Sequence, residues 1–239
     1  FGDSKLQSAG SNAYSLGLIG STNKSNLVIQ DCVNNGTFAI PSKAETNTMS
    51  HVGAFLGILR SNSDSPTIIR CTNNGDISAV VAAGGILGGS AKDTATVTIT
   101  SCVNTGAVTS TYRFAGGIIG YNKGAVEISK CANLGKISAN EYFAGGIAGC
   151  FNGSIDQSYN SGEVTALRYI GGIIGGQNSK DIPLQSISIT NSYNDGKIYA
   201  LPSGVIRENK VPSYAIDYGM VLLMGSIFII LSNALYGIF

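Results

Sequence analysis

The chain contains five cysteines, and four of them open a recurring pentapeptide: Cys32, Cys71, Cys102 and Cys131. Zinc sites use close pairs such as Cys-x-x-Cys, but these four cysteines are separated by 29 to 39 residues. If the repeats stack, neighbouring thiols come within disulfide range, although parallel Cβ directions fit that bond poorly. The pattern therefore favours small, packed thiols, with a disulfide or a metal as the alternatives, and we predict no metal site. Cys150 lies outside the series and is expected to be another buried thiol.

Catalytic chemistry finds little support in the residue types. His51 is the single histidine and lies in a polar stretch without a fixed acidic or nucleophilic partner, so we expect an ordinary surface residue. Glycoside hydrolysis would require a pair of carboxylates, but the carboxylates of this chain are scattered. The Gly-x-x-Gly motifs lack the Lys-Ser/Thr of a phosphate-binding loop and the following helix of a dinucleotide site. We therefore predict a non-enzymatic chain without catalytic residues or cofactors.

Asparagine occupies the third position of every pentapeptide, and glycine the fifth. We predict that each asparagine amide bonds to its counterpart in the next repeat, and that the glycine supplies a positive φ. The asparagines are Asn34, Asn73, Asn104, Asn133, Asn160 and Asn194. Three other asparagines, Asn23, Asn35 and Asn152, begin glycosylation sequons, which matter only in a eukaryotic secretory setting.

The pentapeptide belongs to a longer repeat. Its six copies start 27 to 39 residues apart, and the last two have Ser158 and Ser192 in place of cysteine. An isoleucine stands three residues before each copy: Ile29, Ile68, Ile99, Ile128, Ile155 and Ile189. A Gly-x-x-Gly motif with small or aliphatic residues recurs as well, as in Gly117–Gly120 and Gly146–Gly149. Matching columns at a fixed order identify a repeat protein.

The elements that position these columns are expected to be strands. Residues 97–99 and 126–128 alternate apolar and polar side chains, and no helical period is sustained between residues 13 and 207. We expect about three short strands in each repeat, stacked in parallel about 4.8 Å apart. The prediction is an all-β chain: a lead-in over 1–13, then a right-handed parallel β-helix of about six to seven coils over 14–211. Corner loops are expected at 41–50 and 176–184.

These residues resemble the GLUG-motif repeat, typified by Gly-Gly-Ile-x-Gly followed by an Ile-x-x-Cys-x-Asn-x-Gly stretch. The resemblance covers residues 14 to 207. It implies an exported or surface protein, because such repeats occur in large exported proteins that include some peptidases and adhesin-like molecules. The motif defines the repeat rather than a single function.

Residues 212–239 differ from the repeats. Residues 220–239 carry no charge and are rich in Leu, Ile, Phe and Met, so a C-terminal hydrophobic helix is expected. A membrane span is the favoured interpretation, and a helix that caps the open end of the β-helix or a lipid-anchor signal are the alternatives.

Composition narrows the function further. Charged residues make up 12% of the chain and the formal net charge is +1, which gives no electrostatic basis for binding nucleic acid. We expect a surface-displayed or extracellular, membrane-anchored stalk or adhesion module that contacts a protein or glycan ligand through its corner loops. The alternatives are an accessory region of a larger exported enzyme, peptidase or polysaccharide-active, and an accessory subunit that meets the other subunits of a membrane complex.

Overall fold

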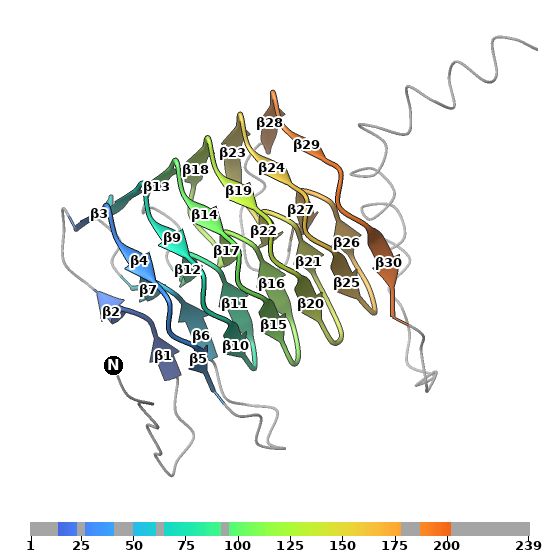
Figure 1. Ribbon diagram of the computed structural model, residues 1–239, viewed down its shortest axis with the longest axis horizontal. Helices are drawn as coiled ribbons and strands as arrows, with labels where there is room; N and C mark the ends of the chain where they lie inside the picture. Colours follow the sequence, from blue (N-terminus) through green and yellow to red (C-terminus); the bar gives the residue numbers. More distant parts are fainter. Residues whose placement is uncertain are drawn as a thin grey trace, which may run out of the picture.

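The computed structural model describes residues 14–22, 27–40, 50–60, 65–91, 96–177 and 187–201, and every regular element in these ranges is a β-strand. The strands form five parallel sheets of six strands each, which run side by side along the long axis of the molecule (Figure 1). We call them sheets I to V in the order in which the chain visits them. A solenoid follows, because each sheet receives one strand from every coil.

Sheets I and II are joined by the Gly-x-x-Gly turns. Sheet I consists of β1 (Tyr14–Leu16), β6 (Ser50–Gly53), β11 (Ala82–Gly84), β16 (Phe114–Gly116), β21 (Ala144–Gly145) and β26 (Ile170–Gly171). Sheet II consists of β2 (Ile19–Thr22), β7 (Leu56–Leu59), β12 (Leu87–Ser90), β17 (Ile119–Asn122), β22 (Ala148–Cys150) and β27 (Ile174–Gly176).

Sheet III carries the isoleucine of each repeat, and sheet IV carries the asparagine of the pentapeptide. Each strand of sheet V begins at an apolar residue two positions after the pentapeptide glycine, such as Val108. Sheet III consists of β3 (Val28–Gln30), β8 (Thr67–Ile69), β13 (Val97–Thr100), β18 (Val126–Ser129), β23 (Gly153–Asp156) and β28 (Ser188–Thr190). Sheet IV consists of β4 (Val33–Asn34), β9 (Thr72–Asn73), β14 (Val103–Asn104), β19 (Ala132–Asn133), β24 (Tyr159–Asn160) and β29 (Tyr193–Asn194). Sheet V consists of β5 (Phe38–Ala39), β10 (Ile77–Ala79), β15 (Val108–Ser110), β20 (Ile137–Ala139), β25 (Val164–Ala166) and β30 (Ile198–Ala200).

The register follows the sequence columns. Ile99 pairs with Ile68 on one side and with Ile128 on the other, and Asn104 pairs with Asn73 and Asn133 in the same way. The predicted all-β parallel solenoid is therefore confirmed, whereas three strands per repeat was wrong, because each coil contains five. The strands that sequence reasoning missed include the two-residue strands of sheet IV, which are too short to show alternation.

The core lies inside the coils and is built from the inward member of each alternating pair. In β13, Val97 and Ile99 are buried while Thr98 and Thr100 are half-buried on the outer face. A main cluster of aliphatic side chains and thiols fills the interior. A second, smaller cluster, which contains Phe114, Tyr121 and Cys150, lies apart from it on sheets I and II.

The turn between sheets III and IV has a conformation that the sequence did not reveal. In every coil the residue just before the Cys/Ser position has a left-handed backbone, with φ between 47° and 56°. These residues are Asp31, Arg70, Ser101, Lys130, Gln157 and Asn191. None is glycine, so each coil holds a turn that L-residues seldom adopt.

The glycine column works differently from our prediction. None of the pentapeptide glycines has a positive φ; within the described residues Gly153, with φ 124°, is the one glycine that does. A Cβ added to Gly106 would lie 2.0 Å from the carbonyl oxygen of Gly75. Glycine is therefore needed because successive coils approach too closely for any side chain, and the predicted positive φ was wrong.

Several predictions fall outside the described residues. The lead-in 1–13, the C-terminal segment 212–239 and nearly all of the two predicted corner loops lie there, and so does Asn23. Within the described residues, no helix is long and apolar enough to cross a membrane.

Candidate ligand-binding surface

The connections from sheet V to sheet I are where the coils differ most in side chains. Three successive connections, residues 111–113, 140–143 and 167–169, carry aromatic and arginine residues, and we call this surface the aromatic corner. The connection one coil earlier, Val80–Val81, is aliphatic and buried.

The rings of the aromatic corner form a continuous stack across successive coils. Phe143 lies between Phe114 and Tyr169, with ring centroids 5.4 Å and 4.6 Å apart, and its ring is within 11° of parallel to that of Tyr169. The ring centroids of Tyr142 and Tyr169 are 6.3 Å apart, and the ring of Tyr112 meets that of Tyr142 edge-on with centroids 6.0 Å apart. Such pairs stabilise one another beyond simple burial. The result is an ordered aromatic strip along the solenoid.

The inner end of the strip is fixed by the second core cluster. Phe114 is buried and stacks on Tyr121 at 4.8 Å, and Cys150 packs in the same cluster. A Cβ at Gly176 would meet the ring of Phe143 at 2.8 Å, so this glycine makes room for the ring. Tyr169 has a left-handed backbone with φ 52°. A large side chain seldom takes this conformation, which often marks functional surfaces.

Two arginines lie over the outer rings. The guanidinium of Arg113 is 4.8 Å from the ring centre of Tyr112, and that of Arg168 is 5.7 Å from the ring centre of Tyr142. Tyr112, Tyr142, Phe143, Arg168 and Tyr169 are half-buried, and Arg113 is exposed. The corner therefore presents flat apolar rings together with positive charge, an arrangement suited to binding rather than to bond cleavage.

A hydroxyl organises the backbone of this corner. Ser110 is buried, and its Oγ accepts a hydrogen bond from the backbone N–H of Arg113 at 3.0 Å and lies 3.1 Å from the carbonyl oxygen of Val80, to which it donates. In the coil before, Ser50 Oγ accepts from the N–H groups of Val80 and Val81. These bonds fix the turns that carry the rings, because buried polar groups seldom go unpaired.

His51 is not the surface residue that we predicted. It lies in β6 and is buried, and its ring covers Gly89 so closely that a Cβ there would be 2.6 Å from His51 Cδ2. Its Nδ1 has no hydrogen-bond partner. Burial, together with the positive charge of Arg60, lowers the pKa of His51 to about 4. The polar residues that precede His51 in the chain gave no sign that it lies in a strand.

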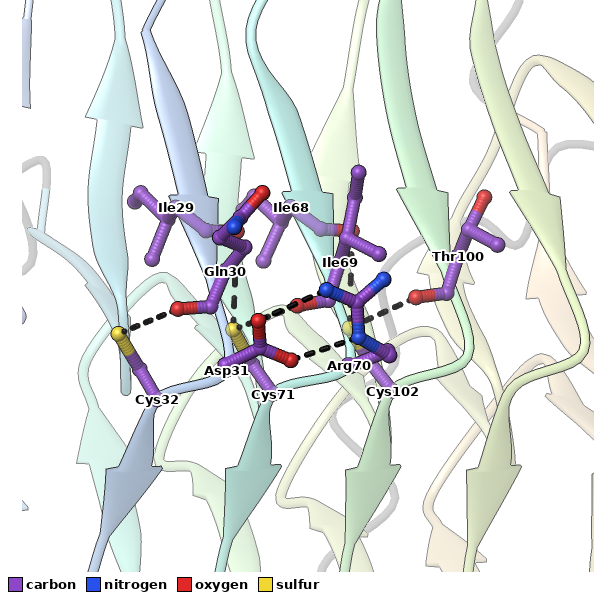
Figure 2. Close-up of polar contacts among 10 residues, drawn as sticks. All are labelled: Ile29, Gln30, Asp31, Cys32, Ile68, Ile69, Arg70, Cys71, Thr100 and Cys102. Atoms are coloured by element: carbon purple, nitrogen blue, oxygen red, sulfur yellow. Dashed lines mark hydrogen bonds and ion pairs between the residues drawn. The ribbon is translucent and has the colours of Figure 1, made fainter.

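The cysteine column forms a line of free thiols (Figure 2). Cys102 Sγ lies 3.4 Å from the carbonyl oxygen of Thr100 and 3.6 Å from that of Ile68, in the previous coil. The backbone N–H of Cys102 donates to Cys131 Sγ at 3.4 Å, and that of Cys131 donates to Ser158 Oγ at 3.1 Å. The position therefore requires a small group that both donates and accepts, which explains why both Cys and Ser occur there.

Burial raises the pKa of Cys71 to about 11, and the hydrogen bond with Cys131 together with burial raises the pKa of Cys102. These thiols are protonated at neutral pH. Beside them, at the outer turn, Arg70 and Asp31 form an exposed ion pair with an Nε–Oδ1 distance of 2.6 Å, which Figure 2 also shows. No group of three or more His, Cys, Asp or Glu side chains suited to a metal occurs in the described residues.

The asparagine column forms the hydrogen-bonded ladder that the sequence predicted. Each Nδ2 donates to the Oδ1 of the next coil's asparagine at 2.6 to 2.7 Å, from Asn34 through to Asn194. The same Nδ2 also donates to the carbonyl oxygen of the glycine two residues on, as from Asn104 to Gly106 at 2.9 Å. The column thus serves the backbone turn and the stack at once.

The two sequons within the described residues differ. Asn35 is exposed, and its Oδ1 accepts from Asn74 Nδ2 at 2.8 Å. Asn152 is fully buried, and its Nδ2 donates to the carbonyl oxygen of Lys123 at 3.0 Å. The folded chain therefore presents Asn35 and not Asn152 to a modifying enzyme.

Sequence reasoning did not identify the aromatic corner, although a signal was present. Phe114, Phe143 and Tyr169 each stand three residues before the first glycine of a Gly-x-x-Gly motif. Aligning on that motif places the three rings in one column, and parallel stacking then brings them together. The columns that repeat define the architecture, whereas these rings belong to a column that varies between coils.

No protein-family model matches the chain, and no curated protein matches it. Among solved structures the chain is similar to a crystal structure described as a "putative immunoglobulin A1 protease" from Bacteroides ovatus, with a TM-score of 0.53 and 19% sequence identity. The alignment covers 84% of this chain and 63% of that one, so the chain spans less than two thirds of that structure. This likeness shows the β-solenoid fold alone.

Proposed function

We propose that this chain is a non-catalytic, exported adhesion module, in which a rigid GLUG-type β-solenoid displays the aromatic corner as its ligand-binding surface at the cell surface, anchored through residues 220–239. One observation carries this proposal. The aromatic strip, with Arg113 and Arg168 over its outer rings, lies where the coils differ in side chains while the rest of each coil repeats. Half-buried aromatic rings and arginines dominate the binding energy of protein surfaces.

The solenoid suits this role mechanically. The backbone of each coil is hydrogen-bonded to its neighbours through five sheets, and the asparagine ladder adds a second line of bonds. Side chains on successive corners are therefore held about 4.8 Å apart in the backbone without needing a ligand to order them. Such preorganisation reduces the entropy lost on binding.

Binding of the purified full chain to a glycan array, together with a Tyr142→Ala/Tyr169→Ala variant, tests the proposal. Wild type is expected to bind a defined set of glycans, and the variant is expected to lose at least about tenfold in affinity, since each ring is a hot-spot anchor. The matched control is Tyr193→Ala, which removes an exposed tyrosine, stacked on Tyr159 at 5.2 Å, from sheet IV. Equal binding by wild type and both variants would contradict the proposal.

A second candidate is an accessory region of a larger exported enzyme. The Bacteroides ovatus structure that shares the fold is named as a protease and is longer than the matched region. In this alternative the aromatic corner would hold a substrate for a catalytic domain encoded in the same gene. A zinc-peptidase His-Glu-x-x-His segment in the adjoining sequence, together with corner variants that impair cleavage by the whole enzyme, would favour it.

A further inference from the structure

Among the described residues, neither arginine of the aromatic corner has an acidic partner. In the part of the chain that the structure describes, the ion pairs are Arg70 with Asp31 and Lys136 with Glu163, so neither Arg113 nor Arg168 is paired with a carboxylate. Arg113 instead donates from Nη2 to the hydroxyl oxygen of Tyr112 at 3.4 Å. A guanidinium that lies over a ring keeps N–H donors at its edge for an anion that arrives from solvent.

The spacing of these groups defines an extended site. Arg113, Tyr142 and Arg168 come from three successive connections between sheets V and I. Two coil steps separate the arginine-bearing turns, or roughly 10 Å of backbone. A ligand that meets both arginines must therefore run along the solenoid and cross the ring of Tyr142.

A peptide strand is a poor match for this surface. Backbone donors in and beside the corner are used between coils, in or next to strands that lie inside six-stranded sheets: Asn140 N–H donates to Ser110 O, Tyr142 N–H to Tyr112 O and Ala144 N–H to Tyr169 O. A peptide therefore has no free sheet edge here on which to add a strand. Nucleic acid fits poorly too, because its phosphates need many cations, whereas this corner has two arginines and one exposed carboxylate, Glu141.

We propose that the aromatic corner binds a carboxylate-bearing oligosaccharide that lies along the solenoid, an inference that rests on the ligand-binding function proposed above. The apolar C–H face of a pyranose ring packs on Tyr142 and Tyr169, while sugar carboxylates take paired N–H donors from Arg113 and Arg168. Bidentate guanidinium–carboxylate contacts are strong and directional, so they select the acidic sugar over its neutral counterpart.

Calorimetric titration of the full chain with oligogalacturonate, hyaluronan oligosaccharide and sialyllactose, each beside its methyl ester, tests this inference. At least one acidic form is expected to bind at least about tenfold more tightly than its ester, and Arg113→Gln/Arg168→Gln is expected to remove that preference. Added salt is expected to weaken binding of the acidic form and to leave the ester unchanged. Arg113→Lys/Arg168→Lys keeps the charge without the planar fork. Its preference for the acidic form is expected to be weaker than that of wild type and stronger than that of the Gln variant.

The matched control is Arg70→Gln, which removes an arginine of the outer turn between sheets III and IV and so leaves the corner intact. Equal affinity for acid and ester in all three pairs would overturn the acidic-sugar inference. In that case the adhesion proposal would still stand if Tyr142→Ala/Tyr169→Ala abolished binding to a neutral glycan. Selective capture of acidic peptides by the wild-type corner would also overturn the inference. Loss of the acid preference on Arg70→Gln would overturn it as well, because overall charge would then explain the binding.

Discussion

The two sides of each coil follow opposite rules. The segment from the isoleucine through the pentapeptide glycine, residues 99–106 in the third coil, keeps the same Ile, Cys or Ser, Asn and Gly positions in every turn, and we call it the repeated arc. The connection from sheet V to sheet I is Val80–Val81 in one coil, and the aromatic corner places Tyr, Phe and Arg there in the next three. In the arc the asparagine side chains bond to their own equivalents in the neighbouring coils. Repetition there is a requirement of stacking, because a ladder exists only if every coil contributes the same group.

The aromatic corner does not need the same side chain in every coil. Its backbone bonds pass between coils as elsewhere, but its side chains contact different partners in each turn. Variation is therefore tolerated by the stack and available for recognition. In a solenoid the column that repeats reports architecture, and the column that varies is where a ligand site should be sought.

The largest effect is expected when the arc is interrupted at its centre. Asn104→Ala removes the donor to Asn133 Oδ1 and to Gly106 O, and the acceptor of Asn73 Nδ2, all in a buried line. Each orphaned buried group costs about 1 to 3 kcal/mol, so we expect the free energy of unfolding to fall by about 4 kcal/mol. Chemical denaturation of the full chain measures this change.

The control for this experiment is Asn74→Ala, one residue after the ladder position Asn73. Asn74 is exposed, and it bonds to Asn35 and Thr105 on the surface. Its removal is expected to cost less than about 1 kcal/mol, because water replaces the lost partners. Similar losses of unfolding free energy in Asn74→Ala and Asn104→Ala would show that the buried ladder contributes no more stability than a surface contact. The contrast between the arc and the corner would then fail.

The second effect concerns the variable side of the coil and depends on pH. His51 shares a register column with Ala82 and Phe114 and stays neutral when buried, with its pKa lowered from 6.5 to about 4. Between these values the unfolded chain binds a proton that the folded chain does not, so stability falls as pH falls from about 6.5 to about 4. The loss approaches about 3 kcal/mol and levels off below the folded-state pKa.

Melting curves from pH 7.5 to pH 3.5 measure this dependence, with His51→Phe as the matched variant that keeps a ring in the column. The variant is expected to lose the decline between about 6.5 and about 4. Hydrogen bonds from Thr190 and from Arg70 lower the pKa values of Asp156 and Asp31, so these carboxyls titrate on the acid side of that window. An unchanged slope in His51→Phe would assign the pH dependence to other groups.

Much of the fold could be predicted because the arc is defined by residue types that recur at fixed positions. The Ile, Cys, Asn and Gly columns define the register, and the structure pairs Ile99 and Asn104 with their equivalents as the columns require. The left-handed turn before each thiol was invisible, because Asp31, Ser101 and Lys130 share no side-chain chemistry and the constraint falls on φ alone. The glycine column was predicted for the wrong reason, since close approach between coils involves residues 31 apart, Gly75 and Gly106.

The candidate site escaped prediction for a related physical reason. Ring stacking between Phe143 and Tyr169 depends on coils that are adjacent in space and 26 residues apart in the chain. The burial of His51 likewise depends on Gly89 of the next coil, which leaves space for the ring. Contacts between unlike residues are not marked by a residue type that repeats from coil to coil. They become predictable once the register of the stack is known.

The smallest effect separates two explanations of the thiol column. If Cys102 needs only to be small, Cys102→Ala and Cys102→Ser should cost the same. If its place depends on donating to Thr100 O and Ile68 O, serine should be tolerated as it is at Ser158, which donates to Asp156 O at 2.9 Å. We expect about 2 kcal/mol lost for alanine and less than about 1 kcal/mol for serine, measured by denaturation. Because the pKa values of Cys71 and Cys102 are raised, these two buried thiols should also resist alkylation at neutral pH until the chain unfolds. Rapid labelling of Cys71 or Cys102 in the folded chain would show that the ladder opens more readily than its hydrogen bonds imply, and the arc would then be no more rigid than the corner.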